Sequence, residues 1–208
     1  VLGQSDCRIE NTHGADVWAM ALAFFPGVVV QERAIKEFHE FPLWQRYNSS
    51  GISMIGQGQM MLGDPLTWLQ WLVGADAWSF DVKFILLRII FAGAIGLSVL
   101  TITGSAGASM AAAFAAPFVG YFIYRVNHAA IFSICYAPLI SLCWLRLTLG
   151  GAARARFWWL AGLMAANWLV LNSGTAKEAY MAALVLNATG ALHFFVEGRR
   201  TDARTFWP

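Results

Sequence analysis

The sequence predicts an all-α protein: a polytopic bundle of transmembrane helices preceded by an outward segment. Hydrophobic residues make up 58% of its 208 residues and charged residues only 12%, whereas soluble domains have about 45–50% and about 25%. Nine of the twelve acidic residues precede Val82, and no carboxylate lies between Val82 and Lys177. This composition excludes a soluble monomeric globule. Ten Trp, fifteen Phe and five Tyr also exclude a disordered chain.

Five apolar runs follow residue 82, each near the ~20 residues that a helix needs to cross a hydrocarbon layer about 30 Å thick. They cover 84–102, 106–124, 129–147, 157–171 and 179–196. We therefore expect two regions, an outward segment at 1–82 and a transmembrane bundle of about five helices at 83–208.

The basic residues predict the orientation, because short loops rich in Lys and Arg stay on the cytoplasmic side. One side of the predicted bundle carries only Arg125 and Lys177 in its loops. The other carries six arginines, which are Arg146, Arg154, Arg156, Arg199, Arg200 and Arg204. We expect these six inside and residues 1–82 outside. Five spans and a first residue Val1 also predict a fragment, with further helices before and after it.

The outward segment is predicted to hold interfacial helices and irregular backbone. Residues 17–30 are uncharged but too short to span a membrane, so we expect an interfacial helix kinked at Pro26. Residues 31–41 carry charges at helical spacing, including the pair Glu32 and Lys36. The following stretch is rich in Pro, Gly, Asn and Ser, which favours an irregular wall of a substrate cleft. Trp68, Trp71 and Trp78 fit an interfacial aromatic belt.

Several classes of function have no support in the sequence. The net charge of +2 is too small for a nucleic-acid partner. Cys135 and Cys143 lie in one apolar run and are expected to pack as small apolar side chains. Nucleotide-binding and Ser-His-Asp motifs are absent, so we expect no cofactor and no metal site. His13 with Asp16 is the one pair that could hold a divalent metal.

The order of several short motifs resembles the bacterial YfhO-type membrane proteins of the GT-C glycosyltransferase superfamily. The resemblance covers nearly the whole chain, as the front part of a longer family pattern. Its motifs are Gly14-Ala15-Asp16, Phe25-Pro26, Pro42-Leu43-Trp44 with Tyr47 and Gly51, Gln59, Asp64-Pro65-Leu66, His128 and Pro138-Leu139. The chain departs from the pattern where the family tends to have Trp-Asn-Pro-Tyr and this sequence has Trp44-Gln45-Arg46-Tyr47. It departs again at the outer turn 174–177.

The resemblance implies a GT-C-like fold in the bacterial cytoplasmic (inner) membrane. It also implies transfer of a sugar from a polyprenyl-phosphate donor to an envelope polymer or lipid acceptor on the outer side. An acidic residue of the first outer loop, here Asp16, would be the general base, because an attacking hydroxyl must lose its proton. Asp16 equally fits a helix N-cap, and the two roles can coexist. Asp6 and Glu10 are second candidates.

The donor phosphate needs cations on the outer side, and Arg46, Arg88, Arg125 and Lys177 qualify by topology. Arg88 lies inside the first span and can instead extend to the headgroups. His128 could bind phosphate or sugar, or simply lie at the interface. The family motifs add three substrate-binding candidates, Trp44, Tyr47 and Gln59. The alternative function is a transporter or flippase that moves a lipid-linked substrate without catalysis, although such proteins usually place ionisable residues near the membrane midplane.

Overall fold

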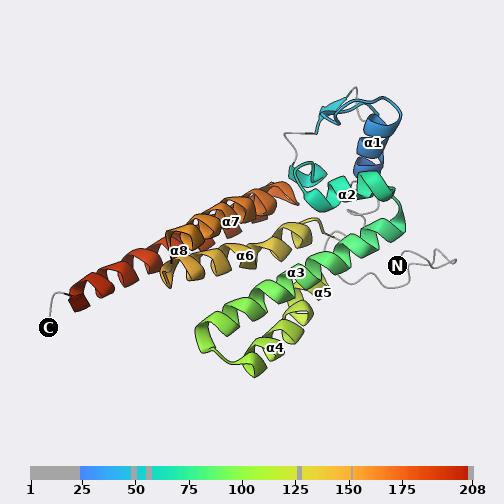
Figure 1. The fold of residues 1–208 in the computed structure, drawn as a ribbon. Helices are drawn as coiled ribbons and strands as arrows, with labels where there is room; N and C mark the ends of the chain where they lie inside the picture. The colour runs from blue at the N-terminus through green and yellow to red at the C-terminus, as the bar shows by residue number, and fades with distance from the viewer. Residues whose placement is uncertain (1–23, 48–50, 55–57, 126–127, 151, 206–208) are drawn as a thin grey trace.

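The computed structural model describes residues 24–47, 51–54, 58–125, 128–150 and 152–205, most of which are helical. The long helices run side by side in an elongated bundle, and the first two helices gather at one end (Figure 1). The elements are α1 Phe25–Lys36, β1 Trp44–Gln45, β2 Ile52–Ser53, η2 Gly58–Met60, α2 Pro65–Val73, α3 Ala77–Thr103, α4 Ala106–Ala115, η3 Ala116–Phe118, α5 Gly120–Tyr124, α6 Ala130–Thr148, α7 Ala153–Asn172 and α8 Ala176–Thr205.

Within the described residues, four helical stretches are long and apolar enough to cross a membrane. They are Ala77–Thr103, Ala106–Tyr124, Ala130–Thr148 and Ala176–Glu197. The predicted span at 157–171 is helical as part of α7, but α7 is not among the four. Arg154, Arg156 and the two asparagines of α7 make it more polar than the other spans. The predicted helical character is confirmed, and the predicted polytopic bundle is supported by four candidate spans rather than five.

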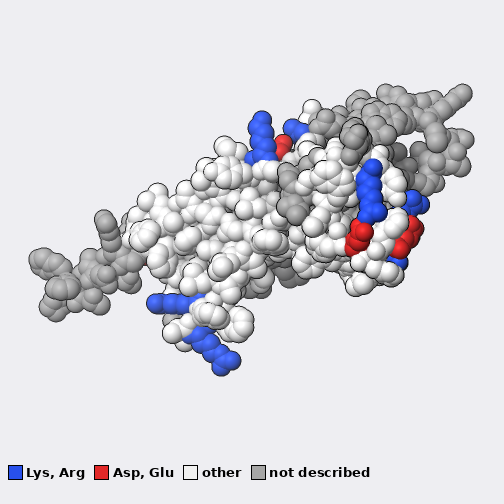
Figure 2. Space-filling view, turned by 90° about the horizontal axis from the view of Figure 1, so that it is seen from above, with Lys and Arg blue, Asp and Glu red and all other residues white. Residues whose placement is uncertain are grey.

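The bundle has two ends, which we name by their landmarks. The α2 end holds α1, α2, the start of α3, the start of α6 and the turn at 172–176. The Arg154 end holds the turn at 103–106, the end of α6 and the start of α7. Figure 2 shows charged side chains near one end of this face, midway along its upper edge and on its lower edge towards the other end, with uncharged surface between these groups.

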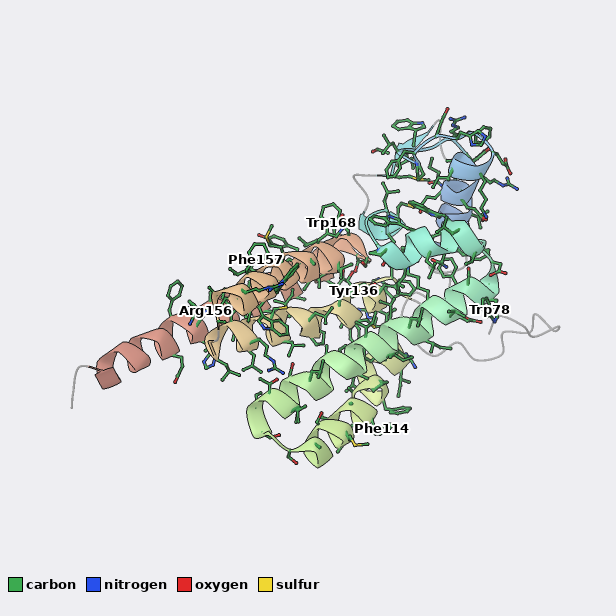
Figure 3. The ribbon with its side chains drawn as sticks, in the orientation of Figure 1. Trp78, Phe114, Tyr136, Arg156, Phe157 and Trp168 are labelled. Carbon is green, nitrogen blue, oxygen red and sulfur yellow. The ribbon has the colours of Figure 1, made fainter. Side chains whose placement is uncertain are left out.

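Helix α6 is the centre of the bundle. Two thirds of its most apolar window (67%) is buried, against 17% for α3 and 11% for α8. Helices α3, α7 and α8 all pack against it. Exposed apolar residues such as Trp78 on α3 and Phe114 on α4 project from the surface (Figure 3). Cys135 and Cys143 are buried in α6 as free thiols, as predicted.

Helix α3 begins earlier than its apolar run, so the predicted boundary at residue 82 falls inside it. The Asp76 carboxylate accepts a hydrogen bond from the Ser79 N–H at 2.7 Å, and the Ser79 hydroxyl accepts one from the Asp76 N–H at 3.2 Å. This reciprocal capping box fixes the first turn. The helix ends at Gly104, whose φ of 65° is left-handed.

The second predicted span, 106–124, is one membrane-length stretch but not one helix. Pro117 lies in η3, which separates α4 from α5, because a proline removes a backbone donor and disrupts the preceding turn. Helix α4 packs closely on α3 through small residues. The Ser109 hydroxyl donates to the Gly96 carbonyl oxygen at 2.8 Å, a contact typical of helix pairs in membranes.

A polar network joins α6, α7 and α8. The indole N–H of Trp144 donates to Asn187 Oδ1 at 2.9 Å, and the Asn187 amide donates to Asn167 Oδ1 at 2.6 Å. The Asn167 and Asn187 amides also donate to backbone carbonyls one turn earlier in their own helices. Because its donors are satisfied, this network holds the three helices in one register.

The segment before α3 is anchored by buried polar contacts of α1. The Gln31 side chain is fully buried, donates to the Met60 carbonyl oxygen at 2.7 Å and accepts from the Trp71 indole N–H at 3.2 Å. Trp71 is therefore inside the protein, and its predicted place in an aromatic belt is wrong. The predicted pair of Glu32 and Lys36 is present, with 2.6 Å between the charged atoms.

A short hairpin departs from the all-α prediction. Trp44 pairs with Ser53 and Gln45 with Ile52 in an antiparallel ladder. Gly51 adopts a φ of 104° in the turn, and the Trp44 indole fills the space that a Cβ on Gly51 would need. Both features require glycine there. Helix α1 has Pro26 in its first turn, and the rest of the predicted 17–30 helix lies partly outside the described residues.

Candidate functional site

The most deeply buried charges in the described chain form one cluster at the α2 end. Lys83 Nζ lies 2.8 Å from Asp64 Oδ2, and the two side chains are 1% and 0% exposed. The Tyr136 hydroxyl donates to Asp64 Oδ1 at 3.0 Å, and Lys83 also donates to the Thr67 hydroxyl at 2.6 Å. The Lys83 ammonium lies 5.0 Å from the centroid of the Phe132 ring. We call these residues the Asp64 cluster.

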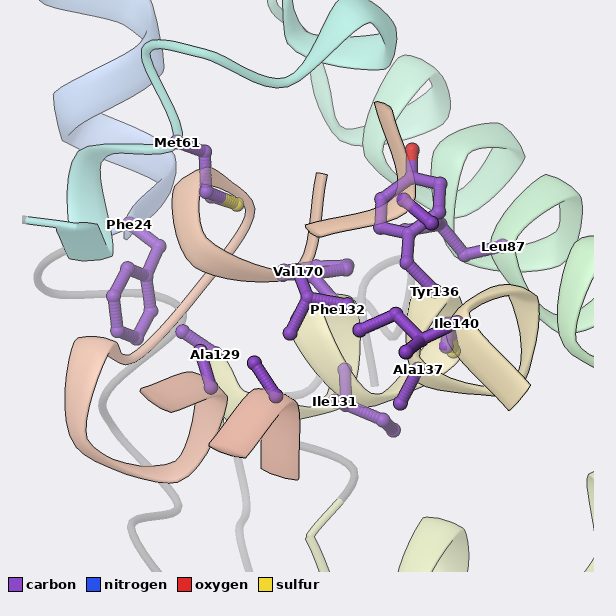
Figure 4. Close-up of a cluster of buried hydrophobic side chains, with 14 of the residues drawn as sticks. Phe24, Met61, Leu87, Ala129, Ile131, Phe132, Tyr136, Ala137, Ile140 and Val170 are labelled. Carbon is purple, nitrogen blue, oxygen red and sulfur yellow. The ribbon is translucent and has the colours of Figure 1, made fainter. Parts of the chain in front are cut away.

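Local sequence places each member of the Asp64 cluster. Asp64 is the N-cap of α2, where its Oδ1 accepts from the Leu66 N–H at 3.1 Å and Pro65 starts the helix. Lys83 lies in the second turn of α3. Tyr136 comes from the buried face of α6, close to Phe132 (Figure 4). The cluster therefore joins α2, α3 and α6.

The contacts of the Asp64 cluster give it a structural role, because they link three helices. Both charges are removed from solvent, so each depends on the other and on the surrounding hydroxyls for stabilisation. Asp64 Oδ1 accepts hydrogen bonds from the Tyr136 hydroxyl and the Leu66 N–H, and Oδ2 lies 2.8 Å from the Lys83 ammonium.

Arg88 is the opposite case, a cation with unfilled donors. Its guanidinium lies 4.4 Å from the Phe84 ring centroid and 5.7 Å from that of Phe122 on α5. Its Nε is buried without a hydrogen-bond partner, and no ion pair to it is formed within the described residues. At 1.5 Å per residue, Arg88 is about 16 Å along α3. An arginine without an ion pair among the described residues is costly at that position.

Arg125 and His128 lie at the turn before α6. His128 Nδ1 accepts from the Ala130 N–H at 3.1 Å, so its ring caps the start of α6. The Glu178 carboxylate at the start of α8 interacts electrostatically with both Arg125 and His128. The segment before α6 and the start of α8 are thus close enough for their charged side chains to interact.

The turn between α7 and α8 packs tightly on α6. Ser133 and Ser173 are both fully buried, and their hydroxyls have no hydrogen-bond partner within the described residues. A Cβ on Gly174 would overlap Ser133 Oγ and the Ala129 carbonyl oxygen. Glycine is required here because the backbone approaches α6 this closely.

The remaining predicted substrate-binding residues lie in and near the hairpin. Trp44 and Tyr47 are 52% and 61% exposed. Arg46 forms an ion pair with Glu40 and lies 4.8 Å from the Phe38 ring centroid. Gln59 is exposed in η2. These side chains surround the β1–β2 and α1 region, whereas Arg88 lies between α3 and α5.

The three predicted acids fall outside the described part of the chain. Asp16, Asp6 and Glu10 all precede residue 24, where the described residues begin. Among the described residues, no group of three or more His, Cys, Asp or Glu side chains is arranged to hold a metal ion.

Sequence reasoning did not select the Asp64 cluster. Asp64 enters the sequence analysis only through the motif Asp64-Pro65-Leu66, and Lys83 is not singled out there. One signal was available: Lys83 begins an apolar run that holds no carboxylate, and a lysine there needs a partner from another segment. The sequence does not say which acid supplies it.

Comparison with known proteins adds no relative. No family model, no curated protein and no solved structure matches the chain.

Proposed function

We propose that the chain is part of a membrane glycosyltransferase of the GT-C type. It would take a sugar from a polyprenyl-phosphate donor and transfer it to an envelope polymer or lipid acceptor on the outer side of the bacterial inner membrane. In this proposal the α2 end faces outward. The observation that carries the proposal is Arg88, a partly exposed cation of α3 whose buried Nε has no hydrogen-bond partner among the described residues.

The physical argument starts from the cost of Arg88. A guanidinium surrounded by aromatic rings and without an acidic partner loses hydration that the rings only partly replace. A phosphate oxygen would supply charge-assisted hydrogen bonds, and the planar guanidinium suits two phosphate oxygens at once. A polyprenyl phosphate carries that anion on a hydrocarbon chain, so it could approach from the bilayer.

The acid needed for transfer would be Asp16, as the family resemblance implies. The acceptor hydroxyl must lose a proton as it attacks the anomeric carbon, and a carboxylate can accept it. The phosphate that departs would be held by Arg88, with Arg125 and His128 as further donors at the same end of the bundle. Trp44, Arg46, Tyr47 and Gln59 would contact the sugar or the acceptor.

Donor binding by the full chain tests the role of Arg88. We expect the Arg88→Gln variant in zwitterionic nanodiscs to bind a radiolabelled polyprenyl-phosphate sugar at least tenfold more weakly, because hydrogen bonds to a charged group are worth about 1.5–3 kcal/mol. Arg146→Gln is the matched control, since Arg146 is also an arginine with a buried, unpartnered Nε but lies at the Arg154 end. Equal donor affinity of the parent and both variants would refute the assignment.

Transfer itself is tested at Asp16. Asp16→Asn keeps the size and capping ability of the side chain but cannot accept a proton. We expect normal insertion and a loss of about 10²-fold or more in sugar transfer. If the Asn variant transfers sugar at the parental rate, Asp16 is not the base. If the parent moves the labelled lipid between leaflets and forms no glycosidic bond, the transporter alternative is correct.

A further inference from the structure

The Arg154 end carries a second group of arginines, far from Arg88. Arg146 lies in the last turn of α6, while Arg154 and Arg156 lie in the first turn of α7. These two helix ends are separated by only four residues of the chain, and α6 and α7 pack against each other. Figure 2 shows two basic side chains projecting from the side nearer the C-terminus, with no acidic side chain beside them among those visible and described.

Arg146 is held in place by an aromatic ring but not by an acid. Its guanidinium carbon lies 5.7 Å from the centroid of the Trp159 ring on α7. Its Nε is buried and has no hydrogen-bond partner within the described residues. The ring fixes the side chain's position, so its donors are oriented before any ligand arrives.

The described residues form no ion pair with Arg146, Arg154 or Arg156. The Arg156 guanidinium packs against Gly150 of the turn, 3.5 Å from the position of a Cβ there. Residue Ala152 supplies no side-chain cap to α7, so free N–H groups of the first turn add positive potential beside the arginines.

The surroundings of these arginines are apolar and exposed. Leu149, Phe157 and Trp158 are 62%, 63% and 63% exposed. Phe157 directly follows Arg156 at the start of α7 (Figure 3). A soluble anion would leave this apolar surface in water, whereas an amphiphile would cover it with its acyl chains while its headgroup meets the arginines.

We propose that the α6–α7 turn binds the phosphate of an anionic phospholipid from the adjacent leaflet. Arg146 is the anchor, and Arg154 and Arg156 complete the charge. Leu149, Phe157 and Trp158 contact the acyl chains. This site lies at the opposite end of the bundle from Arg88 and does not depend on the proposed sugar transfer.

Lipid retention by the full chain tests the proposal. The protein is purified in mixed micelles containing equal phosphatidylglycerol and phosphatidylcholine, and native mass spectrometry counts the bound lipids. We expect one retained phosphatidylglycerol per chain, and at least tenfold weaker retention by Arg146→Gln. Arg33→Gln is the control, because Arg33 is an exposed arginine of α1 that pairs with Glu37, and this variant should retain the lipid like the parent. Inorganic phosphate at millimolar concentration should not displace it.

Three results would overturn the proposal. Equal retention of phosphatidylcholine would show a nonspecific lipid annulus, displacement by inorganic phosphate would show a soluble-anion site, and parental retention by Arg146→Gln would show that Arg146 is not the anchor. If Arg146→Gln lacks the parental helix content by circular dichroism, Arg154→Gln replaces it. Because Arg154 is exposed, this substitution should not disturb folding, and it should lower phosphatidylglycerol retention at least threefold. Parental retention would equally contradict the proposal.

Discussion

Breaking the Asp64–Lys83 pair should destabilise the protein far more than removing both charges. Asp64→Asn keeps the shape of the side chain, the α2 cap and an acceptor for Tyr136. It leaves the Lys83 ammonium with the Thr67 hydroxyl, a Met61 sulfur contact and the Phe132 ring but without a carboxylate. Removing one member of a buried pair costs about 3–5 kcal/mol, because the other charge is left uncompensated.

The opposite single change should cost less. In Lys83→Met the Asp64 carboxylate keeps the Tyr136 hydroxyl and the Leu66 N–H, so we expect a cost near the lower limit, about 3 kcal/mol. The double variant Asp64→Asn/Lys83→Met carries no charge at this position. We expect it to lie within about 1–2 kcal/mol of the parent, because replacing a whole buried ion pair is often nearly neutral.

Equilibrium unfolding measures all of these values. The purified full chain is titrated with sodium dodecyl sulfate in mixed micelles, and helix content is followed by circular dichroism. Tyr136→Phe is the matched control: it removes one hydrogen bond and no charge, so it should cost about 1 kcal/mol. A double variant at least as unstable as the two single variants summed would refute the view that the two charges stabilise each other.

Two further predictions concern helix packing and use the same unfolding assay. Gly174→Ala should cost about 1–3 kcal/mol because its Cβ would overlap Ser133 Oγ, whereas Gly93→Ala on α3, where a Cβ meets nothing within 4 Å, should be neutral or stabilising by up to about 1 kcal/mol. Equal effects of the two changes would contradict the close approach at Gly174. Asn187→Leu should cost about 1–2 kcal/mol, since it leaves the Trp144 indole N–H without its acceptor; an unchanged transition would show that the network contributes nothing.

The sequence predicted the helical segments well because apolar length is a strong signal. The error at the start of α3 has a physical cause. Hydropathy treats Asp81 and Lys83 as the edge of the membrane, whereas Lys83 is inside the protein because Asp64 neutralises it. The cap at Asp76 then extends the helix back to Ala77. A partner from another segment is invisible to any local window.

The other incorrect predictions also arise from contacts with distant parts of the chain. Trp71 resembles its neighbours Trp68 and Trp78 in the sequence, but only Trp71 faces the Gln31 amide. Pro117 could be recognised as a helix breaker, yet its effect depends on how α5 packs. The two-residue strands of the hairpin are too short for an alternation pattern. The sequence shows that Arg88 lies in an apolar run. Only the structure shows that Arg88 forms no ion pair among the described residues.

The direction in which the chain crosses the membrane is the claim on which the outward site depends. Tyr47 and Arg154 are exposed at opposite ends of the bundle, so each can be replaced by cysteine in a full chain whose Cys7, Cys135 and Cys143 are changed to alanine. Intact cells are then treated with a membrane-impermeant maleimide. If the α2 end faces outward, we expect position 47 to be labelled in intact cells and position 154 only after the cells are permeabilised. Labelling of position 154 in intact cells would contradict it.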